Sequence, residues 1–214
     1  MRTLIKYLAR SNANNKYAVK PFLATGNANN KYAVNKFSSS PAKRRGILIV
    51  RGIGMDIKQG CLYFITDDFF VTVNDPYLKI NYEQAQRPHY FAIKEPATSL
   101  YWLVPCSSRV DKYKSIIQMR REQNKSTYGL KIIKIQGNKN ALLFQDMFPI
   151  IEKYIQAPYI RGGQVVRISD PKVINDLESN AKTVISLLRG GTRFTPTQPD
   201  VLRIEQIMLA ELNS

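Results

Sequence analysis

Acidic residues are absent from the first quarter of this chain, and their distribution limits what can fold. Residues 1–54 contain 11 Lys and Arg but no Asp or Glu, whereas residues 55–214 contain 21 basic and 16 acidic residues. The first part is rich in Asn and Lys and buries too little apolar surface to offset the entropy of ordering it. We therefore expect residues 1–54 to be disordered. Residues 55–214 are long enough for one domain with a substantial core.

The first part also repeats itself. The phrase NANNKYAV occurs at 12–19 and again at 27–34, an offset of 15 residues. Two copies are too few for a solenoid, which needs at least about three repeats. The acid-free composition also fits an organellar transit peptide, although such peptides have no reason to repeat. No apolar run approaches the roughly 20 residues that a membrane span needs, so we expect no membrane association.

The net charge of +16 is typical of a nucleic-acid-binding protein, but most of it lies in the first part. Residues 79–139 carry 12 basic and 4 acidic residues, whereas residues 140–214 carry 8 of each. A polyanion should therefore bind against residues 79–139. The cysteines, Cys61 and Cys106, have apolar neighbours and are expected to be buried free thiols in a reducing cytoplasm.

From Met55 onward the patterns predict an α+β domain, a compact sheet of five to seven mostly antiparallel strands with several helices. The strands are expected at 61–65, 69–73, 90–94, 100–104, 129–135, 141–144 and 164–168. Helices are expected at 110–123, at 149–155, from Pro171 to just before Gly190, and at 199–212. Asp170 and Pro171 are start signals for the third of these helices. Gly137-Asn138 predicts a hairpin between the fifth and sixth strands.

His89 is the only histidine of the chain. A single histidine is more often a packed or surface residue than a functional one. A metal site is not expected, because no second histidine exists and the cysteines lack ligand spacing. The residue lies in Arg87-Pro88-His89-Tyr90, where a strand is predicted to begin. An imidazole at a sheet edge, beside a cation and an aromatic ring, is suited to proton transfer near neutral pH.

Two serines, Ser107 and Ser108, lie between a predicted strand and a predicted helix. Serine at such a place commonly caps the helix. The free backbone N–H groups of a helix start, with Arg109, Lys112 and Lys114 nearby, also suit a bound phosphate. A serine hydrolase of the G-x-S-x-G type is not indicated, because that motif is absent.

The predicted helix at 110–123 is basic, and aromatic residues accompany its cations. Cations bind an RNA backbone and exposed aromatic rings stack on unpaired bases, so the combination suits single-stranded or looped RNA. A basic helix is also commonly just a solvated face. The residues expected to contact RNA are Arg87, Tyr90, Lys94, Trp102, Arg109, Tyr113, Lys114, Arg120, Arg121 and Lys125.

Residues 55–214 resemble the endoribonuclease toxins of type III toxin–antitoxin systems, the ToxN, AbiQ and CptN group, and are most similar to the CptN branch. The resemblance rests on three ordered elements. They are Arg87-Pro88-His89-Tyr90 opening a strand, a strand ending in Pro105-Cys106-Ser107-Ser108, and the phrase LFQDMFPI at 143–150 before C-terminal helices. It implies a strongly twisted antiparallel sheet with helices, related to the Kid/MazF toxins.

The resemblance also implies an activity and a partner. The family cleaves RNA at adenine-rich sites without a metal ion, leaving a 2′,3′-cyclic phosphate and a 5′-hydroxyl. It is inhibited by a small structured repeat RNA that binds the toxin directly. The chain is accordingly expected to be a cytoplasmic bacterial enzyme without a cofactor. It would act on cellular or phage RNA and form a closed toxin–RNA assembly.

The family's active-site residues map onto this chain in part. Its Pro-x-Thr/Ser-Ser loop falls on Ser107 and Ser108, and the basic residue at its strand start, often lysine, falls on His89. The lysine that follows the serine pair has no clean counterpart, since Arg109 comes first and Lys112 later. A tyrosine near the start of the family domain is replaced by Phe69, which donates no hydrogen bond.

In RNA transesterification the substrate's own 2′-hydroxyl is the nucleophile. The protein must orient this hydroxyl, accept its proton and stabilise the phosphorane. We assign proton transfer to His89, positioning to Ser107 and Ser108, and charge stabilisation to Lys112 or Arg109. Two alternatives remain, a non-catalytic RNA-binding module that uses the same basic helix and a partner-binding domain with a merely basic surface. Cleavage products and salt-dependent RNA affinity distinguish the three.

The resemblance offers an origin for the repeat as well. Type III toxins are encoded just downstream of an RNA gene made of tandem nucleotide repeats, and an offset of 15 residues corresponds to 45 nucleotides of coding sequence. We therefore expect residues 1–54 to be the antitoxin region translated in frame, with the native protein starting at Met55.

Overall fold

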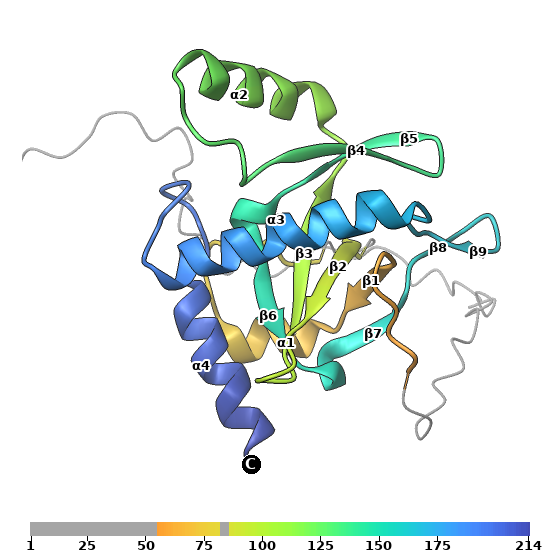
Figure 1. The fold of residues 1–214 in the computed structure, drawn as a ribbon. Helices are drawn as coiled ribbons and strands as arrows, with labels where there is room; N and C mark the ends of the chain where they lie inside the picture. The colour runs from red at the N-terminus through yellow and green to blue at the C-terminus, as the bar shows by residue number, and fades with distance from the viewer. Residues whose placement is uncertain (1–54, 82–85) are drawn as a thin grey trace, which may run out of the picture. The chain divides into compact units, whose positions relative to one another are not determined.

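The computed structural model describes residues 55–81 and 86–214. The expectations of disorder in residues 1–54 and of a native start at Met55 concern a part of the chain outside these residues. The described part is an α+β domain built around a seven-stranded sheet (Figure 1). All strand pairings among the described residues are antiparallel, which confirms the predicted fold class.

The strands are β1 Leu62–Ile65, β2 His89–Lys94, β3 Tyr101–Ser107, β4 Lys131–Ile135, β5 Asn138–Leu142, β6 Phe148–Ile150 and β7 Ile155–Pro158. Their order across the sheet is β4-β5-β3-β2-β1-β7, and β6 pairs with β3 beside this path. A separate hairpin consists of β8 Ile160–Arg161 and β9 Gln164–Val165. The strand pair β2–β3 therefore lies in the middle of the sheet.

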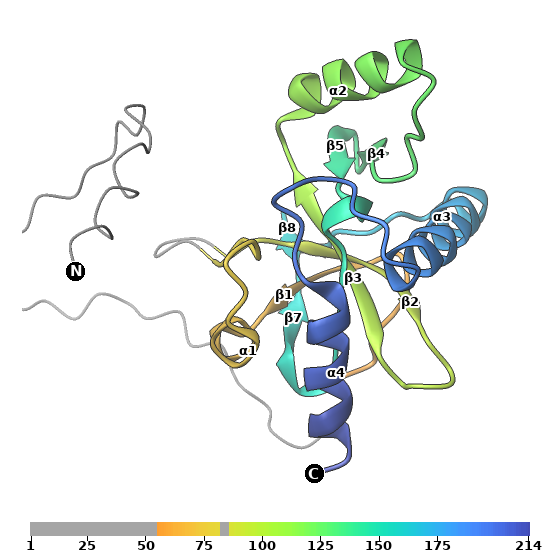
Figure 2. The same cartoon turned by 90° about the vertical axis from the view of Figure 1, so that its left-hand side faces the viewer.

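The helices are α1 Asp67–Val73, α2 Val110–Glu122, α3 Pro171–Arg189 and α4 Val201–Leu212, and two short 3-10 helices are η1 Phe144–Asp146 and η2 Glu152–Tyr154. Helix α3 lies across β2 (Figure 1), α4 packs on β6, and α2 lies over the β4–β5 hairpin (Figure 2). Helix α3 begins as predicted, because the Asp170 carboxylate accepts a hydrogen bond from the Lys172 N–H at 2.9 Å.

Both faces of the central sheet are buried. On β3, Tyr101 and Leu103 point into a core shared with α1 and α4, whereas Trp102 and Val104 point into a second core under α3. This alternation explains why β2 and β3 read as continuous apolar runs, since successive side chains of a strand face opposite sides. A third, smaller cluster lies between α2 and the β4–β5 hairpin.

The segment 69–73 is helix α1 and not the strand that its aromatic and β-branched residues predict. A strand would place Phe69 and Phe70 on opposite faces, whereas the helix buries both, with Val73, in one core. Asp67 and Asp68 occupy the first turn, where negative charge is favourable. Tertiary packing of the two rings therefore overrides local preference.

The segment 149–155 is also not the helix predicted there. Pro149 lies within β6, opposite Trp102 of β3, and only a single 3-10 turn, η2, follows it. Proline is acceptable in this strand because β6 pairs on one side alone and needs no second ladder donor. Phe148 and Ile150, on either side of the proline, are buried in the core beside α1.

Two further segments differ in detail from prediction. The expected strand at 164–168 is shorter, since β9 ends at Val165 and Arg167 forms only an isolated bridge with Cys61. The predicted β4–β5 hairpin is present, and its two turn residues are Gln136 and Gly137, with φ of 44° and 83°. Positive φ at both positions is the requirement of a type I′ turn.

Candidate active site

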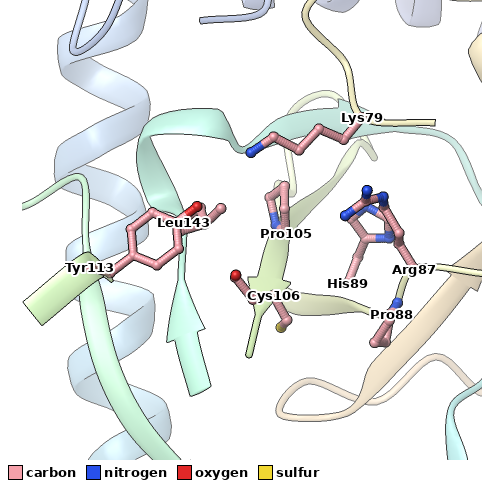
Figure 3. Close-up of a pocket in the computed structure, with 9 residues that line it drawn as sticks. Lys79, Arg87, Pro88, His89, Pro105, Cys106, Tyr113 and Leu143 are labelled. Atoms are coloured by element: carbon pink, nitrogen blue, oxygen red, sulfur yellow. The ribbon is translucent and has the colours of Figure 1, made fainter. Parts of the chain in front are cut away.

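A small pocket of about 30 Å³ lies where β2 begins and β3 ends (Figure 3). Its volume holds about one water molecule. It forms because His89 pairs with Pro105 across the two strands, which brings the segments 87–90 and 105–108 together. The lining residues are Lys79, Arg87, Pro88, His89, Pro105, Cys106, Ser107, Tyr113 and Leu143.

His89 lies inside the sheet, so its expected position at a sheet edge is wrong. It pairs with Tyr63 of β1 on one side and with Pro105 of β3 on the other. Its side chain is 1% exposed, and its ring meets the Phe148 ring edge-on at 5.5 Å between centroids. The Nδ1 atom has no hydrogen-bond partner among the described residues. This ring nitrogen is therefore a buried polar atom without such a partner, in a residue that lines the pocket.

Burial determines the protonation state of His89. Its pKa is lowered to about 3, chiefly by desolvation; a hydrogen bond with the Arg87 backbone acts in the opposite direction, and the charge of Arg87 contributes to the lowering. The ring is consequently neutral at neutral pH. It can accept a hydrogen bond there, but in the unliganded protein it is a weak base.

The two predicted serines have different positions. Ser107 ends β3, lines the pocket, and its Oγ accepts a hydrogen bond from the Arg109 N–H at 3.2 Å. Ser108 is exposed and is not part of the lining. The N-cap residue of α2 is Arg109, so neither serine caps the helix in the expected manner. The structure brings Ser107, and not Ser108, to His89.

The cations of the pocket are Lys79 and Arg87. Neither Lys112 nor Arg109, the predicted charge stabilisers, lines it; the Lys112 Nζ lies 5.8 Å from the centroid of the Tyr113 ring, and both cations are exposed. Lys79 was missed because it lies in the loop between α1 and β2, without a motif around it. The only indication in the sequence is that Lys79 begins the basic stretch of residues 79–139.

Tyr90 and Trp102 are fully buried under α3, with 0% exposure. Neither ring offers a face to a nucleobase, so the predicted stacking role is wrong for both. Lys94 also lies away from the pocket. It is five residues along β2 from His89, about 17 Å at 3.3 Å per residue, and its Nζ lies over the Tyr101 ring.

Helix α2 carries the remaining predicted RNA contacts. Tyr113 packs beneath the helix and lines the pocket, and the Arg120 guanidinium donates to the Phe194 carbonyl at 3.1 Å. Lys114 pairs with Asp111 at 3.1 Å. The exposed cations of the segment are Arg109, Lys112, Lys114, Arg121 and Lys125. Their contact with RNA stays a prediction.

A solved structure has a similar fold. It is described as AbiQ, a lactococcal anti-phage endoribonuclease belonging to the type III toxin–antitoxin system. The match covers 73% of this chain and 100% of the other, with a TM-score of 0.56 and 13% sequence identity. This chain has the AbiQ fold. No protein-family model and no curated protein matches the sequence.

The likeness to AbiQ confirms the predicted resemblance at the level of the fold. In this AbiQ-like domain both cysteines are free thiols, and burial raises the pKa of Cys106 to about 12, so its thiol stays protonated. No three His, Cys, Asp or Glu side chains of residues 55–81 and 86–214 are grouped to hold a metal ion. No helix in these ranges is long and apolar enough to cross a membrane.

Proposed function

We propose that this chain is the endoribonuclease toxin of a type III toxin–antitoxin system. The observation that carries the proposal is the pairing of His89 with Pro105, which places a buried imidazole, the Ser107 hydroxyl and two cations around one pocket. The fold shared with AbiQ supports an RNA-cleaving toxin in general. The chemistry of the pocket fits attack by the 2′-hydroxyl of the RNA itself.

In this reaction the 2′-oxygen forms a bond to phosphorus while the bond from phosphorus to the 5′-oxygen breaks. The His89 imidazole accepts the proton of the 2′-hydroxyl, the leaving 5′-oxygen takes a proton from water, and the resulting hydroxide takes the proton from His89. The scissile phosphate is an anion, and an anion next to an imidazole raises the pKa of that imidazole. Substrate binding thus makes His89 a stronger base than it is in the unliganded protein.

Ser107 positions the phosphate. Its Oγ accepts from the Arg109 N–H, which leaves its own proton to donate to a phosphate oxygen. Ser108 and Lys112, which do not line the pocket, belong with the RNA-binding surface of α2. There the exposed cations contact RNA phosphates without sequence preference.

The finer properties follow the family resemblance. The chain cleaves at adenine-rich sites, and a small structured repeat RNA inhibits it by binding the toxin directly in a closed toxin–RNA assembly. The native polypeptide starts at Met55, and residues 1–54 are translated antitoxin sequence. Intact-mass measurement of the native protein tests the start, and a mass that includes residues 1–54 would contradict it.

Cleavage is tested with the purified full chain and a structured RNA in the presence of a metal chelator. We expect fragments with 2′,3′-cyclic phosphate and 5′-hydroxyl ends, and about 100-fold or more slower cleavage by His89→Gln. RNA that binds with a steep salt dependence but stays intact would support the alternative, a non-catalytic RNA-binding module. No affinity at moderate salt would support a partner-binding domain.

A further inference from the structure

The geometry points to a cation that the sequence motifs do not contain. We propose that Lys79, held by Asp146, stabilises the negative charge of the phosphorane and that Asp146 is its positioning residue. This assignment rests on the proposed RNA cleavage and takes the place of Lys112 or Arg109 in it. It starts from the position of Lys79, whose side chain extends across the pocket above Pro105 (Figure 3).

The residues next to Lys79 on both sides are held in place. Before it, Leu78 is buried in the core beside α1 with 8% exposure. After it, the Ile80 carbonyl accepts a hydrogen bond from the Arg87 Nε at 3.0 Å, and the Asn81 side-chain amide donates to the Ile65 carbonyl at 3.1 Å. The backbone at Lys79 is thus anchored to the sheet, and its side chain starts from a defined place.

The far end of the Lys79 side chain is also held. Its Nζ lies 3.4 Å from the Asp146 Oδ2. The Asp146 side chain is 13% exposed, and desolvation raises the pKa of this carboxyl while the charge of Lys79 opposes the shift. A carboxylate this far removed from water is unfavourable without a cation beside it. The Lys79 ammonium supplies that cation.

Asp146 is itself built onto the pocket wall. It ends η1, and its N–H donates to the Leu143 carbonyl at 3.0 Å. The Leu143 N–H in turn donates to the Pro105 carbonyl at 3.0 Å, and both of these residues line the pocket. Two backbone hydrogen bonds therefore connect the carboxylate to the strand position opposite His89. A displacement of Asp146 would require a displacement of the pocket.

This arrangement suits the transition state better than the other pocket cation does. An ammonium has three donors, and one contact to Asp146 leaves two for phosphate oxygens. The Arg87 Nε already donates to the Ile80 carbonyl, so this guanidinium also holds the backbone next to Lys79. An ammonium prepositioned at the phosphate stabilises charge without reorganising as the charge develops.

The test compares Lys79→Gln, Lys79→Arg, Asp146→Asn and the double variant Lys79→Gln/Asp146→Asn in the full chain. The matched control is Lys182→Gln, which removes the lysine of a lysine–carboxylate pair on α3, at 2.7 Å from Glu178 and outside the pocket. Single-turnover cleavage of an RNA gives the rate. The Kd for the same RNA with 2′-O-methyl groups gives affinity without reaction.

We expect Lys79→Gln to cleave about 100-fold more slowly while its Kd changes by less than about 3-fold. Lys79→Arg should recover part of the rate, and Asp146→Asn should lose about 10-fold because the ammonium is retained but less well held. The double variant should regain thermal stability lost in Lys79→Gln, yet not the rate. Lys182→Gln should match the original protein.

The assignment is overturned if a folded Lys79→Gln or double variant cleaves within about 3-fold of the original protein. It is also overturned if Kd weakens as much as the rate, since Lys79 would then only anchor RNA. An original protein that leaves every RNA intact, by contrast, overturns the proposed cleavage itself. The two failures are therefore distinguishable.

Discussion

The Arg189 guanidinium donates two parallel hydrogen bonds to the Glu95 carboxylate, at 2.7 and 2.8 Å. Glu95 directly follows β2, and Arg189 ends α3. The same guanidinium binds Glu205 of α4, and its Cζ lies 5.6 Å from the centroid of the Trp102 ring. One side chain thus joins α3, α4 and the end of the β2–β3 pair that is farthest from the pocket.

Replacing Arg189 should destabilise the fold. Arg189→Ala leaves Glu205, which is 8% exposed, without its cation, and we expect a loss of about 2 kcal/mol in the free energy of unfolding. Arg189→Lys should lose less, because it keeps the charge but not the paired geometry. Urea unfolding followed by circular dichroism measures both. Equal midpoints for all three proteins would contradict a structural role.

His89 should make the fold sensitive to acid. Its pKa of about 3 lies below the value of about 6.5 in an unfolded chain, so between them the unfolded chain alone binds the proton. Its contribution is complete above about pH 6.5 and is lost as the pH falls toward 3. From about pH 7.5 to 5, the original protein should lose about 2 kcal/mol more than His89→Gln. Chemical denaturation measures the free energy of unfolding of both proteins across this pH range. The same pH dependence in both would exclude a contribution from His89.

Under the proposed RNA cleavage, the same His89 pKa predicts two different pH profiles. The ratio kcat/KM follows the unliganded enzyme, so it should show no acidic limb from His89 above about pH 5. The profile of kcat follows the RNA complex, in which the phosphate raises the His89 pKa, and its acidic limb should lie at higher pH. Steady-state rates across this range test the difference. Coincident limbs near 6.5 would show an exposed histidine instead.

Ser107 and Ser108 should respond differently to the same substitution. Ser107→Ala removes the pocket hydroxyl and should slow cleavage by about 100-fold. Ser108→Ala alters an exposed side chain outside the pocket and should change the rate by less than about 3-fold. Single-turnover rates at saturating enzyme compare them directly. A larger effect at Ser108 would reverse the assignment.

The buried indole of Trp102 should act in folding and not in RNA contact. Trp102→Phe keeps an aromatic ring in the core, and we expect lower stability, by about 1–3 kcal/mol, with unchanged RNA affinity. Filter binding with 2′-O-methyl RNA measures the affinity. A weakened Kd in the folded variant would restore the stacking role that the burial of this residue contradicts.

The sequence predicts best those elements in which one pattern of apolar residues recurs many times. Helix α3 has apolar residues at helical spacing over five turns, with Asp170 before it and Gly190 after it, so its limits are predicted almost to the residue. The segments α1 and β6 are too short for such averaging. The structure of each segment depends on the core into which Phe69 or Phe148 packs. That core is formed by residues from distant parts of the sequence.

The residues of the pocket also divide into those that the sequence predicts and those that it does not. His89 and Ser107 stand in short motifs beside predicted strands, and antiparallel pairing brings these strands together. Lys79 and Asp146 are 67 positions apart, and nothing in the spacing of either residue indicates their contact. The spacing of residues within a strand also does not show which side of a strand buried on both faces packs against a helix. The sequence therefore predicts RNA contacts for Tyr90 and Trp102, although both side chains build the core.

The pairing of β1 with β7 sets an order of events during synthesis. Tyr63 and its partner Pro158 are 95 positions apart, so β1 leaves the ribosome long before the strand that completes its outer edge exists. At about 5–20 residues per second, roughly 5–20 s separate the two strands, and α4 follows later still. The nascent chain therefore carries an unfinished sheet throughout this interval, and the domain is complete only after α4 has been made.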